Sequence, residues 1–500
     1  MAIPKILGIE TEYGITVTGV EDWNPVTASS AVVTSYAGEL RRIRWDFEDE
    51  HPLRDARGFE TAVLLDAPTD EDLGLASVVL TNGARFYVDH AHPEYSTPEC
   101  TDPYDLVVHD RAGERIMESA IEMAGARFPD GRRFLVYKNN TDNKGVSYGC
   151  HENYLVSRQI PFPAIVELMI PHFVTRQVYL GAGLLTDRDE EQPYRISQRA
   201  DFFEVEVGLE TTLKRPIVNT RDEPHADPEK YRRLHVIIGD ANMSEVATWL
   251  KTGVTALILS MLEDDQAPED LHIDKPVATL RRISRDITCA EQIRLKDGRS
   301  MTPVQVQWLL HESVSKWATR ADLPDWGPDI LRRWEEALAG LERDPMSMSR
   351  TIDWVAKYKV LQEYREKHSL DARHAKLHML DLQYHDVRRS KGISYVLERS
   401  GKLERLTDDA SVDRAMTEPP NDTRAYFRGK VLERFGDRVA AASWDSIIFD
   451  LGGDRLQRLP MHEPLKGTEE MVGEILEQAE DAEALVAALR GAPGDVPPRS

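Results

Sequence analysis

The chain has 500 residues and a formal net charge of −24, from 62 basic and 86 acidic side chains. This acidic balance argues against general binding to nucleic acid or to an anionic membrane surface, so an acidic partner would need a local basic patch. Hydrophobic residues make up 41% and charged residues 30%, which is the ordinary composition of a globular protein with a sizeable core.

The cysteines and the N-terminal segment indicate the compartment. Cys100, Cys150 and Cys289 are far apart and form no CxxC pair, which excludes a zinc ribbon and a disulfide framework. The opening "MAIPKILGIETE" lacks the pattern of a signal peptide, and no apolar run approaches the roughly 20 residues that a membrane span needs. We expect a cytoplasmic protein with no nucleic-acid partner and no membrane partner.

The first predicted element is the β-strand "ILGIETEYGITV", residues 6–17, within a region of strand and turn over 1–35. Side chains two residues apart in a strand lie on the same face, so Glu10 and Glu12 point the same way. Glutamate is disfavoured in strands, and a single one is usually just exposed to solvent. Two on one face of an inner strand suggest a chemical role.

Residues 41–76 interrupt this pattern. They are rich in Asp, Glu and Arg and show no sustained period. Loops of this length are uncommon inside compact domains. We interpret the segment as an insertion, which is either a lid or regulatory loop, or a passive surface loop.

A second polar strand face follows at 77–100. Asn82-Gly83 predicts a hairpin turn between "SVVL" and "ARFYVD", and the latter strand has one apolar and one polar face. The polar side chains of this region are Arg85, Tyr87 and Asp89 on the strand, and Glu94 and Glu99 in the proline-rich stretch after it.

Helix and strand alternate beyond this point. Apolar residues at helical spacing predict a helix from Pro103 to about Ala126. Strands are expected at 132–140, from Cys150, within 202–220 and in "RRLHVIIGD". On the strand "CHENYLV", His151 and Asn153 share a face, which gives a third polar group at a predicted strand.

The chain becomes mainly helical from Asn242. Asn242 with Glu245, and Thr302 with Gln305, are predicted to cap two scaffold helices.

The composition changes again at 417–429, and a short strand (442–451) and an amphipathic helix (467–490) are expected after it. The sequence therefore predicts a main domain over 1–420 and a small C-terminal domain over 421–500.

The carboxylates of the three polar groups point to a divalent cation. Oxygen ligands with an occasional imidazole suit Mg²⁺ or Mn²⁺, whereas zinc prefers Cys or more His. Carboxylates crowded on an inner sheet face repel one another, and cations that bridge nucleotide phosphates would relieve this repulsion. The chain has no P-loop, HExxH or GxSxG motif, so a nucleotide would need another architecture. The residues alone predict a metal-dependent site and leave the reaction open.

Three motifs carry a resemblance to a known family: "GIETEYG", "RFYVD…HPEYSTPEC" and "YGCHENYLV". The chain resembles the Pup ligase/deamidase family of the carboxylate–amine ligase superfamily, which is related to glutamine synthetase. The similarity runs over nearly the whole chain, through "TRAYFRGK" (423–430) and "SWDSIIFD" (443–450). It implies an α+β fold, a curved antiparallel β-sheet cradle backed by helices, with ATP and Mg²⁺ on the concave face and a small C-terminal domain.

The family contains two sister enzymes. A ligase joins the C-terminal glutamate of the small protein Pup to substrate lysines with ATP hydrolysis. A depupylase hydrolyses that isopeptide bond and deamidates the C-terminal Gln of Pup to Glu, and by resemblance it requires ATP without consuming it stoichiometrically.

The insertion at 41–76 resembles the loop that marks the depupylase, and Tyr13 and the short spacing in "DHAHPE" favour the same enzyme. We therefore expect an ATP- and Mg²⁺-dependent amidase whose partners are Pup and pupylated proteins, with the Pup ligase as the alternative. An amine ligase of the glutamate–cysteine type and a nucleotide-bound protein without catalysis are further alternatives.

The resemblance assigns roles residue by residue. Asp89 matches the catalytic aspartate, as a nucleophile or as a general base. The matched metal ligands are Glu10, Tyr87 and Glu94, and the candidates for a second ion are Glu99, Glu12 and His151. The matched nucleotide contacts are Arg85, Thr97 and Trp444. Arg424 and Arg428 are expected either to meet phosphate or to form ion pairs at the domain junction.

Pup is small and acidic by the same resemblance, so an enzyme with a charge of −24 needs a local basic groove for it. Residues 385–406 are one candidate; alternatively they form an ordinary mixed-charge helix and loop. The cations of this segment are Arg388, Arg389, Lys391, Lys402 and Arg405.

Overall fold

An antiparallel sheet of six strands lies at the centre of the described part of the chain, in the order β13-β8-β1-β6-β5-β4. The structure is a computed structural model that describes residues 2–38, 40, 43–48, 50–58, 76–142, 145–187, 193–268, 271–453 and 456–491. The strands of the central sheet are β1 (Leu7–Glu12), β4 (Ser77–Val79), β5 (Arg85–Asp89), β6 (His92–Ser96), β8 (Cys150–Ser157) and β13 (Tyr231–Val236).

Alternating side chains give this sheet one apolar and one polar face. On β1, Leu7 and Ile9 are buried in the core, whereas Glu10 lies opposite His151 of β8 and Glu12 lies opposite Glu94 of β6. Side chains of paired residues in antiparallel strands point to the same side. The polar residues predicted from three separate segments therefore meet on one face of the sheet.

The stretch 6–17 forms two strands in two sheets, not one. After Tyr13 the chain continues as β2 (Gly14–Thr18), which pairs with β7 (Arg133–Tyr137) in a separate two-stranded sheet. The face shared by Glu10 and Glu12 lies wholly within β1, so the interpretation of that face is unaffected.

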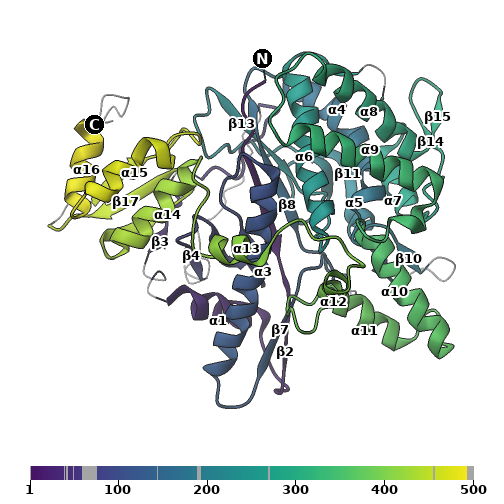
Figure 1. Cartoon of the computed structure of the whole chain (residues 1–500), viewed down its shortest axis with the longest axis horizontal. Helices are drawn as coiled ribbons and strands as arrows, with labels where there is room; N and C mark the ends of the chain where they lie inside the picture. The colour runs from purple at the N-terminus through teal and green to yellow at the C-terminus, as the bar shows by residue number, and fades with distance from the viewer. Residues whose placement is uncertain are drawn as a thin grey trace.

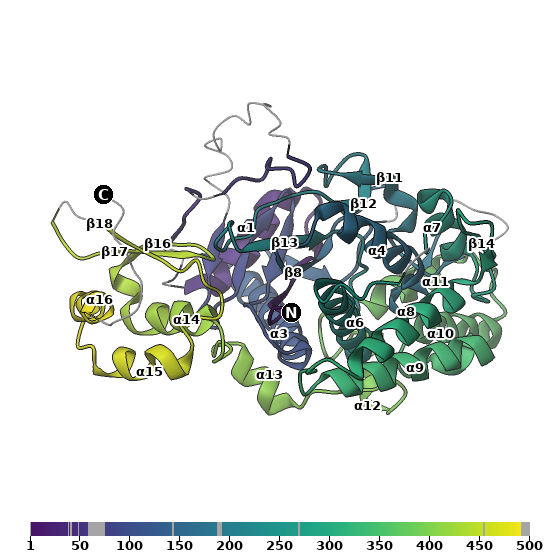
Figure 2. The ribbon, with the colours of Figure 1, turned by 90° about the horizontal axis from the view of Figure 1, so that it is seen from above.

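Helices cover the apolar face. The long helix α3 (Pro103–Ala126) packs against the sheet on the side nearer the viewer in Figure 1, and a larger helical layer surrounds α6 (Glu245–Glu263) on the other side of the molecule from the C-terminal elements (Figures 1 and 2). The other helices of this layer are α4 (Phe162–Thr175), α5 (Gln177–Leu180), α7 (Pro276–Arg285), α8 (Pro303–Ala318) and α9 (Gly327–Arg343).

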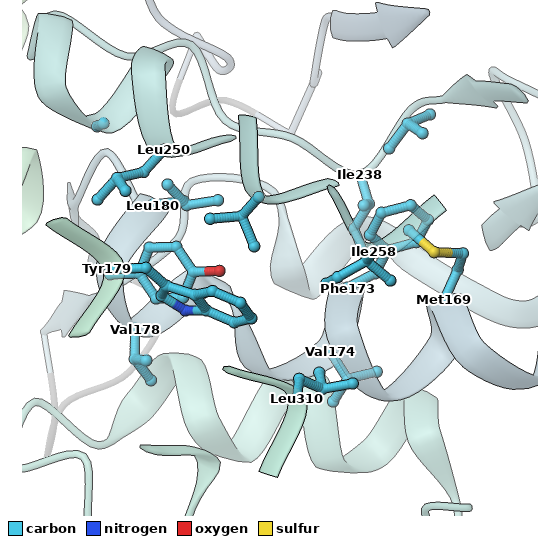
Figure 3. Packing of buried hydrophobic residues seen from close by; sticks show 14 of the residues in the cluster. Met169, Phe173, Val174, Val178, Tyr179, Leu180, Ile238, Leu250, Ile258 and Leu310 are labelled. Atoms are coloured by element: carbon cyan, nitrogen blue, oxygen red, sulfur yellow. The ribbon is translucent and has the colours of Figure 1, made fainter. Parts of the chain in front are cut away.

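Figure 3 shows the apolar core of this layer, where side chains of α4, α5, α6 and α8 interdigitate. By length and composition α6 could cross a bilayer, but 94% of its apolar window is buried inside the protein. Burial on nearly all sides explains why its sequence is apolar around the whole circumference.

The remaining elements frame this core. The helices are α1 (Pro25–Ala37), α10 (Asp353–His368), α11 (Ala375–Tyr384), α12 (Ile393–Arg399) and α13 (Asp409–Ala415), with short 3₁₀ turns at Ala200–Phe202, Pro345–Met348 and Gly436–Arg438. The short strands are β9 (Leu184–Leu185), β10 (Tyr194–Arg195), β11 (Phe203–Gly208), β12 (Arg215–Asn219), β14 (Ile293–Arg294) and β15 (Ser300–Met301).

The C-terminal elements have a sheet and an apolar cluster of their own. They are α14 (Arg424–Phe435), β16 (Val439–Ala442), β17 (Ser446–Asp450), β18 (Leu456–Pro460), α15 (Glu469–Gln478) and α16 (Ala482–Gly491), seen at the yellow end of the chain in Figure 1. The helix predicted over 467–490 is thus two helices. The sheet also contains β3 (Arg44–Trp45), which runs parallel to β16. The domain boundary at 420 stays a prediction.

Several local predictions are confirmed. The helix Pro103–Ala126, the hairpin of β4 and β5 and the capping box of Thr302 and Gln305 are all present. Of the insertion at 41–76, residues 41–42, 49 and 59–75 lie outside the described residues, so its role as a lid or passive loop stays open.

Two further local predictions are wrong. Residues 25–37, expected as strand and turn, form α1, capped by Asn24. This segment is rich in β-branched residues and packs against α3, so tertiary burial decides its structure over local propensity. The cap of α6 is Ser244 and not Asn242, whose amide instead donates to the Leu180 carbonyl and to Asp353.

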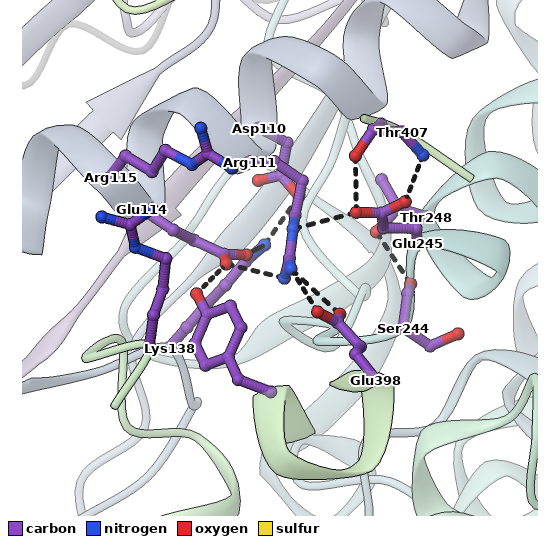
Figure 4. Close-up of polar contacts among 12 residues, drawn as sticks. Asp110, Arg111, Glu114, Arg115, Lys138, Ser244, Glu245, Thr248, Glu398 and Thr407 are labelled. Carbon is purple, nitrogen blue, oxygen red and sulfur yellow. Dashed lines mark hydrogen bonds and ion pairs between the residues drawn. The ribbon is translucent and has the colours of Figure 1, made fainter. Parts of the chain in front are cut away.

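A buried ionic network ties α3 to two other helices (Figure 4). Arg111 of α3 lies 2.9 Å from Glu114, 3.0 Å from Glu245 of α6 and 2.8 Å from Glu398 of α12. Lys138, just after β7, lies 2.6 Å from Asp110 and 2.8 Å from Glu114. Each cation here faces at least two carboxylates, so removing one would leave several buried charges unpaired.

We predict that Arg111→Met lowers the free energy of unfolding by about 3 to 5 kcal/mol, because buried carboxylates lose their partner. The matched control is Arg332→Met, whose ion pairs to Asp329 and Glu336 are on the surface, and it should cost less than about 1 kcal/mol. Urea denaturation followed by circular dichroism measures both, and equal losses for the two variants would contradict the prediction.

Candidate active site

One cluster of carboxylates lies where β1, β5 and β6 run side by side. Ligand oxygens of Glu12, Asp89 and Glu94 are all within 4.8 Å of one another. Tyr87, opposite Glu94 in the register, donates its hydroxyl to the Glu94 carboxylate at 2.6 Å. The three carboxylates and this phenol were predicted from sequence, and the pairing of the strands brings them together.

Glu12 is held in place by groups on both neighbouring strands. The Gly149 N–H donates to it at 2.7 Å, and His92 Nδ1 lies 3.4 Å away. Burial opposes its ionisation, but the nearby imidazoles of His92 and His151 and the Gly149 N–H outweigh burial and lower the pKa of Glu12 to about 2. A Cβ on Gly149 would lie 2.6 Å from the Glu12 carboxylate and 2.2 Å from the His151 ring, so a larger residue here would displace these two side chains.

The pKa of Glu94 is shifted in the opposite direction from that of Glu12. Glu94 is 2% exposed, and burial together with the neighbouring carboxylates, Asp89 first, raises its pKa well above the usual range. A buried carboxylate with like charges around it is stabilised by a cation. Oxygen donors of this kind suit a hard divalent ion such as Mg²⁺ or Mn²⁺.

A second cluster surrounds Glu10. Its carboxylate accepts from Asn153 Nδ2 at 2.7 Å and lies 3.4 Å from His151 Nδ1, and ligand atoms of Glu10, His151 and His235 are within 4.8 Å of one another. Burial and the charge of Arg233 lower the pKa of His235 well below its usual range, so the imidazole is neutral and can bind a metal.

Arg233 and His235 were missed at the level of sequence. Both lie on β13, in which Leu234, between them, and Val236, after His235, are buried in the core. The alternation in "RRLHV" is the signal that could have identified them.

A cleft of about 570 Å³, open solvent included, lies at the other end of β1. Its polar lining includes Glu10, Thr97, Glu99, Arg424 and Trp444. Thr97 and Trp444 thus face the same space, and their role as nucleotide contacts stays a prediction.

Thr97 is fixed by β1, because the Ile9 N–H donates to its hydroxyl at 3.1 Å. The third predicted nucleotide contact, Arg85, stacks over the ring of Trp45 at 3.7 Å and over the ring of Tyr87 at 3.9 Å. The Arg85 guanidinium therefore lies beside the Tyr87 phenol.

Asp89 is the accessible member of the first cluster. It ends β5, its side chain is 40% exposed, and His90 Nδ1 lies 3.0 Å from its carboxylate. A substrate can therefore approach this carboxylate, whereas Glu12 and Glu94 are buried behind it.

Glu99 lies apart from both clusters. Its carboxylate lies between Arg424 and Arg428 of α14, whose charges outweigh burial and lower its pKa to about 2. The two arginines form ion pairs, one of the two alternatives expected for them. A metal-ligating role for Glu99 stays a prediction.

Arg199, which carries no signal in the sequence pattern, is a further cation near the site. It is 1% exposed, and its Nε and Nη1 have no hydrogen-bond partner among the described residues. Burial and the charge of Arg215 lower the pKa of Arg199 to about 10, while Glu12 opposes that shift.

Three of the five cations of the basic segment 385–406 already have carboxylate partners. Arg388 pairs with Asp386, Arg389 with Glu118 and Arg405 with Asp409. These contacts favour the alternative of an ordinary mixed-charge helix and loop.

Comparison with known proteins identifies the family. Residues 5–448 match the model of the Pup-ligase protein family. This chain belongs to that family. A protein named depupylase from Acidothermus cellulolyticus is 56% identical over 500 residues, 97% of this chain and 99% of the relative. A Pup–protein ligase of Acidimicrobium ferrooxidans is 41% identical over 80% of this chain and 89% of its own length.

Two solved structures of the family match the fold. The complex between the prokaryotic ubiquitin-like protein Pup and its ligase PafA has a TM-score of 0.81 and 31% identity, over 97% of this chain and 94% of that chain. PafA in complex with ADP has a TM-score of 0.73 and 35% identity, over 80% of this chain and 89% of that one. The predicted α+β fold with its antiparallel sheet cradle is therefore confirmed.

The carboxylate cluster predicts a specific response to Mg²⁺. Adding Mg²⁺ should raise the melting temperature, because a cation relieves the repulsion among Glu12, Asp89 and Glu94. Glu94→Gln removes one charge from the cluster, so the metal-free variant should melt no lower than the wild type and should lose most of the Mg²⁺-induced rise.

Thermal denaturation with Mg²⁺ and with EDTA measures both effects. Glu118→Gln, which removes a carboxylate paired with Arg389 outside the site, is the control and should keep the response. An unchanged Mg²⁺ response in Glu94→Gln would contradict the assignment of a cation to this cluster.

Proposed function

We propose that this protein is a depupylase, an amidase that releases Pup from pupylated proteins and deamidates the C-terminal Gln of Pup to Glu. The carrying observation is the 56% identity to a depupylase over nearly the full length of both chains. The ligase of Acidimicrobium ferrooxidans is less similar, at 41% identity. Pup and pupylated proteins are the partners in this function.

We propose Asp89 as the catalytic group. Amide hydrolysis needs a nucleophile, a proton donor for the leaving amine and stabilisation of the tetrahedral oxyanion. Asp89 can attack the carbonyl itself or take the proton from a water molecule, and its exposure at the end of β5 suits either role. His90 against its carboxylate orients the attacking oxygen.

We propose that Glu10, Tyr87 and Glu94 hold Mg²⁺. Their donor atoms are oxygens, and the crowding of carboxylates around Glu94 is the feature that a bound cation would relieve. When bound, such ions would supply positive charge beside the reacting carbonyl, and the anionic phosphates of a nucleotide would help to hold the ions in place. Asn153 and His151 keep Glu10 ionised and aimed at the site.

ATP is the proposed nucleotide, with Thr97, Trp444 and Arg85 as its contacts. A cleft lined by Thr97 and Trp444 beside Glu10, and the ADP complex of PafA, support this assignment. Hydrolysis of an amide in water is thermodynamically favourable, so ATP would act here without stoichiometric consumption. A ligase, in contrast, must hydrolyse ATP to activate a carboxylate.

We further propose that the enzyme acts in the cytoplasm and that its chain divides into a main domain (1–420) and a small C-terminal domain (421–500). The free and buried state of Cys100, Cys150 and Cys289 supports a reducing compartment. The separate apolar cluster of the C-terminal elements supports the division.

The decisive assay incubates a Pup–protein conjugate with the enzyme, ATP and Mg²⁺ and follows the release of free Pup on gels. We expect the wild type to release Pup and Asp89→Asn to be slower by about 10² to 10⁴-fold, as for the loss of a general base. Asp130→Asn, which alters an exposed ion pair with Arg132, is the control and should keep the rate. Absence of release by the wild type would overturn the assignment.

The ligase alternative has its own signature. Pup ending in Glu, a lysine acceptor and ATP should yield no conjugate with this enzyme. Formation of conjugate with matching production of ADP would make it a ligase.

A further inference from the structure

Glu99 sits at the junction between the cleft and the C-terminal elements. It follows β6, and its carboxylate accepts from Arg424 Nε at 2.8 Å and from Arg428 Nη1 at 3.2 Å, while Arg428 Nη2 pairs with its second oxygen. The Glu99 carbonyl accepts from the Thr423 hydroxyl at 2.9 Å. Both carboxylate oxygens are thus bound by residues more than 300 positions away in the chain.

Arg428 uses its donors on three separate segments. Besides Glu99, its Nη1 donates to the Trp444 carbonyl at 3.0 Å, and its Nε and Nη2 donate to the Gly83 carbonyl at 3.1 Å and 2.7 Å. The guanidinium carbon also lies 5.1 Å from the centre of the Trp444 ring. Arg428 is 0% exposed, so it cannot reach a phosphate in the cleft without giving up these bonds.

The same contacts fix the hairpin that carries the catalytic strand. A Cβ on Gly83, at the tip between β4 and β5, would lie 3.0 Å from Ala425 of α14, so the hairpin and this helix are in direct contact. On the far side of Trp444, the ring of Trp45 packs edge-on at 5.6 Å, and Arg85 of β5 stacks over Trp45 at 3.7 Å.

We propose that Glu99 is a positioning residue for the nucleotide cleft. Through Arg428 it holds Trp444, which lines the cleft, and with Trp444 the C-terminal elements, against the β4–β5 hairpin that carries Asp89. This role rests on the nucleotide site of the proposed function. It adds the contact, between Glu99 and Arg428, that assembles the site from two parts of the chain. It replaces metal ligation as the role of Glu99. Neither of the described carboxylate clusters contains Glu99, whereas two buried guanidinium groups occupy its oxygens.

The physical reason for the pair is geometric. Lysine has a single point of charge, whereas the planar guanidinium of Arg428 spans Glu99, Trp444 and Gly83 at once. Neither Glu99→Gln nor Arg428→Lys can preserve this set of contacts. Both variants should therefore loosen the same wall of the cleft while leaving the carboxylates that face the scissile bond in place.

The test is equilibrium binding of ATP in the presence of Mg²⁺, without conjugate, by isothermal titration calorimetry. We expect Glu99→Gln and Arg428→Lys each to raise the Kd for ATP by about tenfold, a tenfold change in Kd being about 1.4 kcal/mol. The double variant should be no weaker than the worse single variant, because both substitutions break one contact. In the cleavage assay the rate at saturating ATP should stay within about twofold of the wild type, and the Mg²⁺ concentration for half-maximal rate should not change.

Arg434→Lys is the matched control. Arg434 lies on the same helix and donates to the carbonyls of Leu476 and Ala479, so its loss weakens the C-terminal elements without touching Glu99 or Trp444. We expect a lowered melting temperature and an unchanged Kd for ATP. An equal rise of Kd in Arg434→Lys would show that general loosening, and not the Glu99–Arg428 pair, is responsible.

Three other results would overturn the proposal. The first is wild-type affinity for ATP in both single variants, and the second is additive effects on Kd in the double variant. The third is a shift of the Mg²⁺ requirement in Glu99→Gln but not in Arg428→Lys, which would indicate that Glu99 is a metal ligand. Failure of the proposed function is separate, since it appears as a wild type that binds ATP but releases no Pup.

Discussion

Repulsion among carboxylates on the polar face of the central sheet is the main physical constraint on this structure. Oxygens of Glu12, Asp89 and Glu94 lie within 4.8 Å of one another on three adjacent strands. Such an arrangement is unfavourable in a buried setting and stable only with compensating partners. The fold provides some of them through the Gly149 N–H, His92 and the Tyr87 hydroxyl. The remaining imbalance is the feature for which we propose bound cations on this face.

A face of this kind requires a rigid support, and the helical side of the sheet supplies it. The apolar side chains of β1, β8 and β13 pack with α3 and α6, and those of β4, β5 and β6 pack with α1 and α3. Around α3, Arg111 and Lys138 bind carboxylates from several elements and so fix α3, α6 and α12 relative to one another. The polar face can therefore keep unfavourable neighbours at short distance, because the other face is held by burial and by paired charges.

The cleft at the far end of β1 depends on a different kind of contact. Its floor belongs to the sheet, but its wall includes Trp444 from the C-terminal elements. The two parts are joined by Glu99 and Arg428, a buried pair whose charges are fully used in holding segments together. In the proposed function, this contact links nucleotide binding to the position of the C-terminal elements, apart from the chemistry proposed for Asp89.

The sequence by itself determined the strands, their polar faces and the candidate residues on them, because a period of two is a local property of the chain. It could not identify Arg233 and His235 as neighbours of Glu10, or α1 as a helix. Only the tertiary structure decided which strands pair, and that Glu99 binds two arginines of α14. Pairing order and domain contact arise from interactions between residues hundreds of positions apart, which no local pattern encodes.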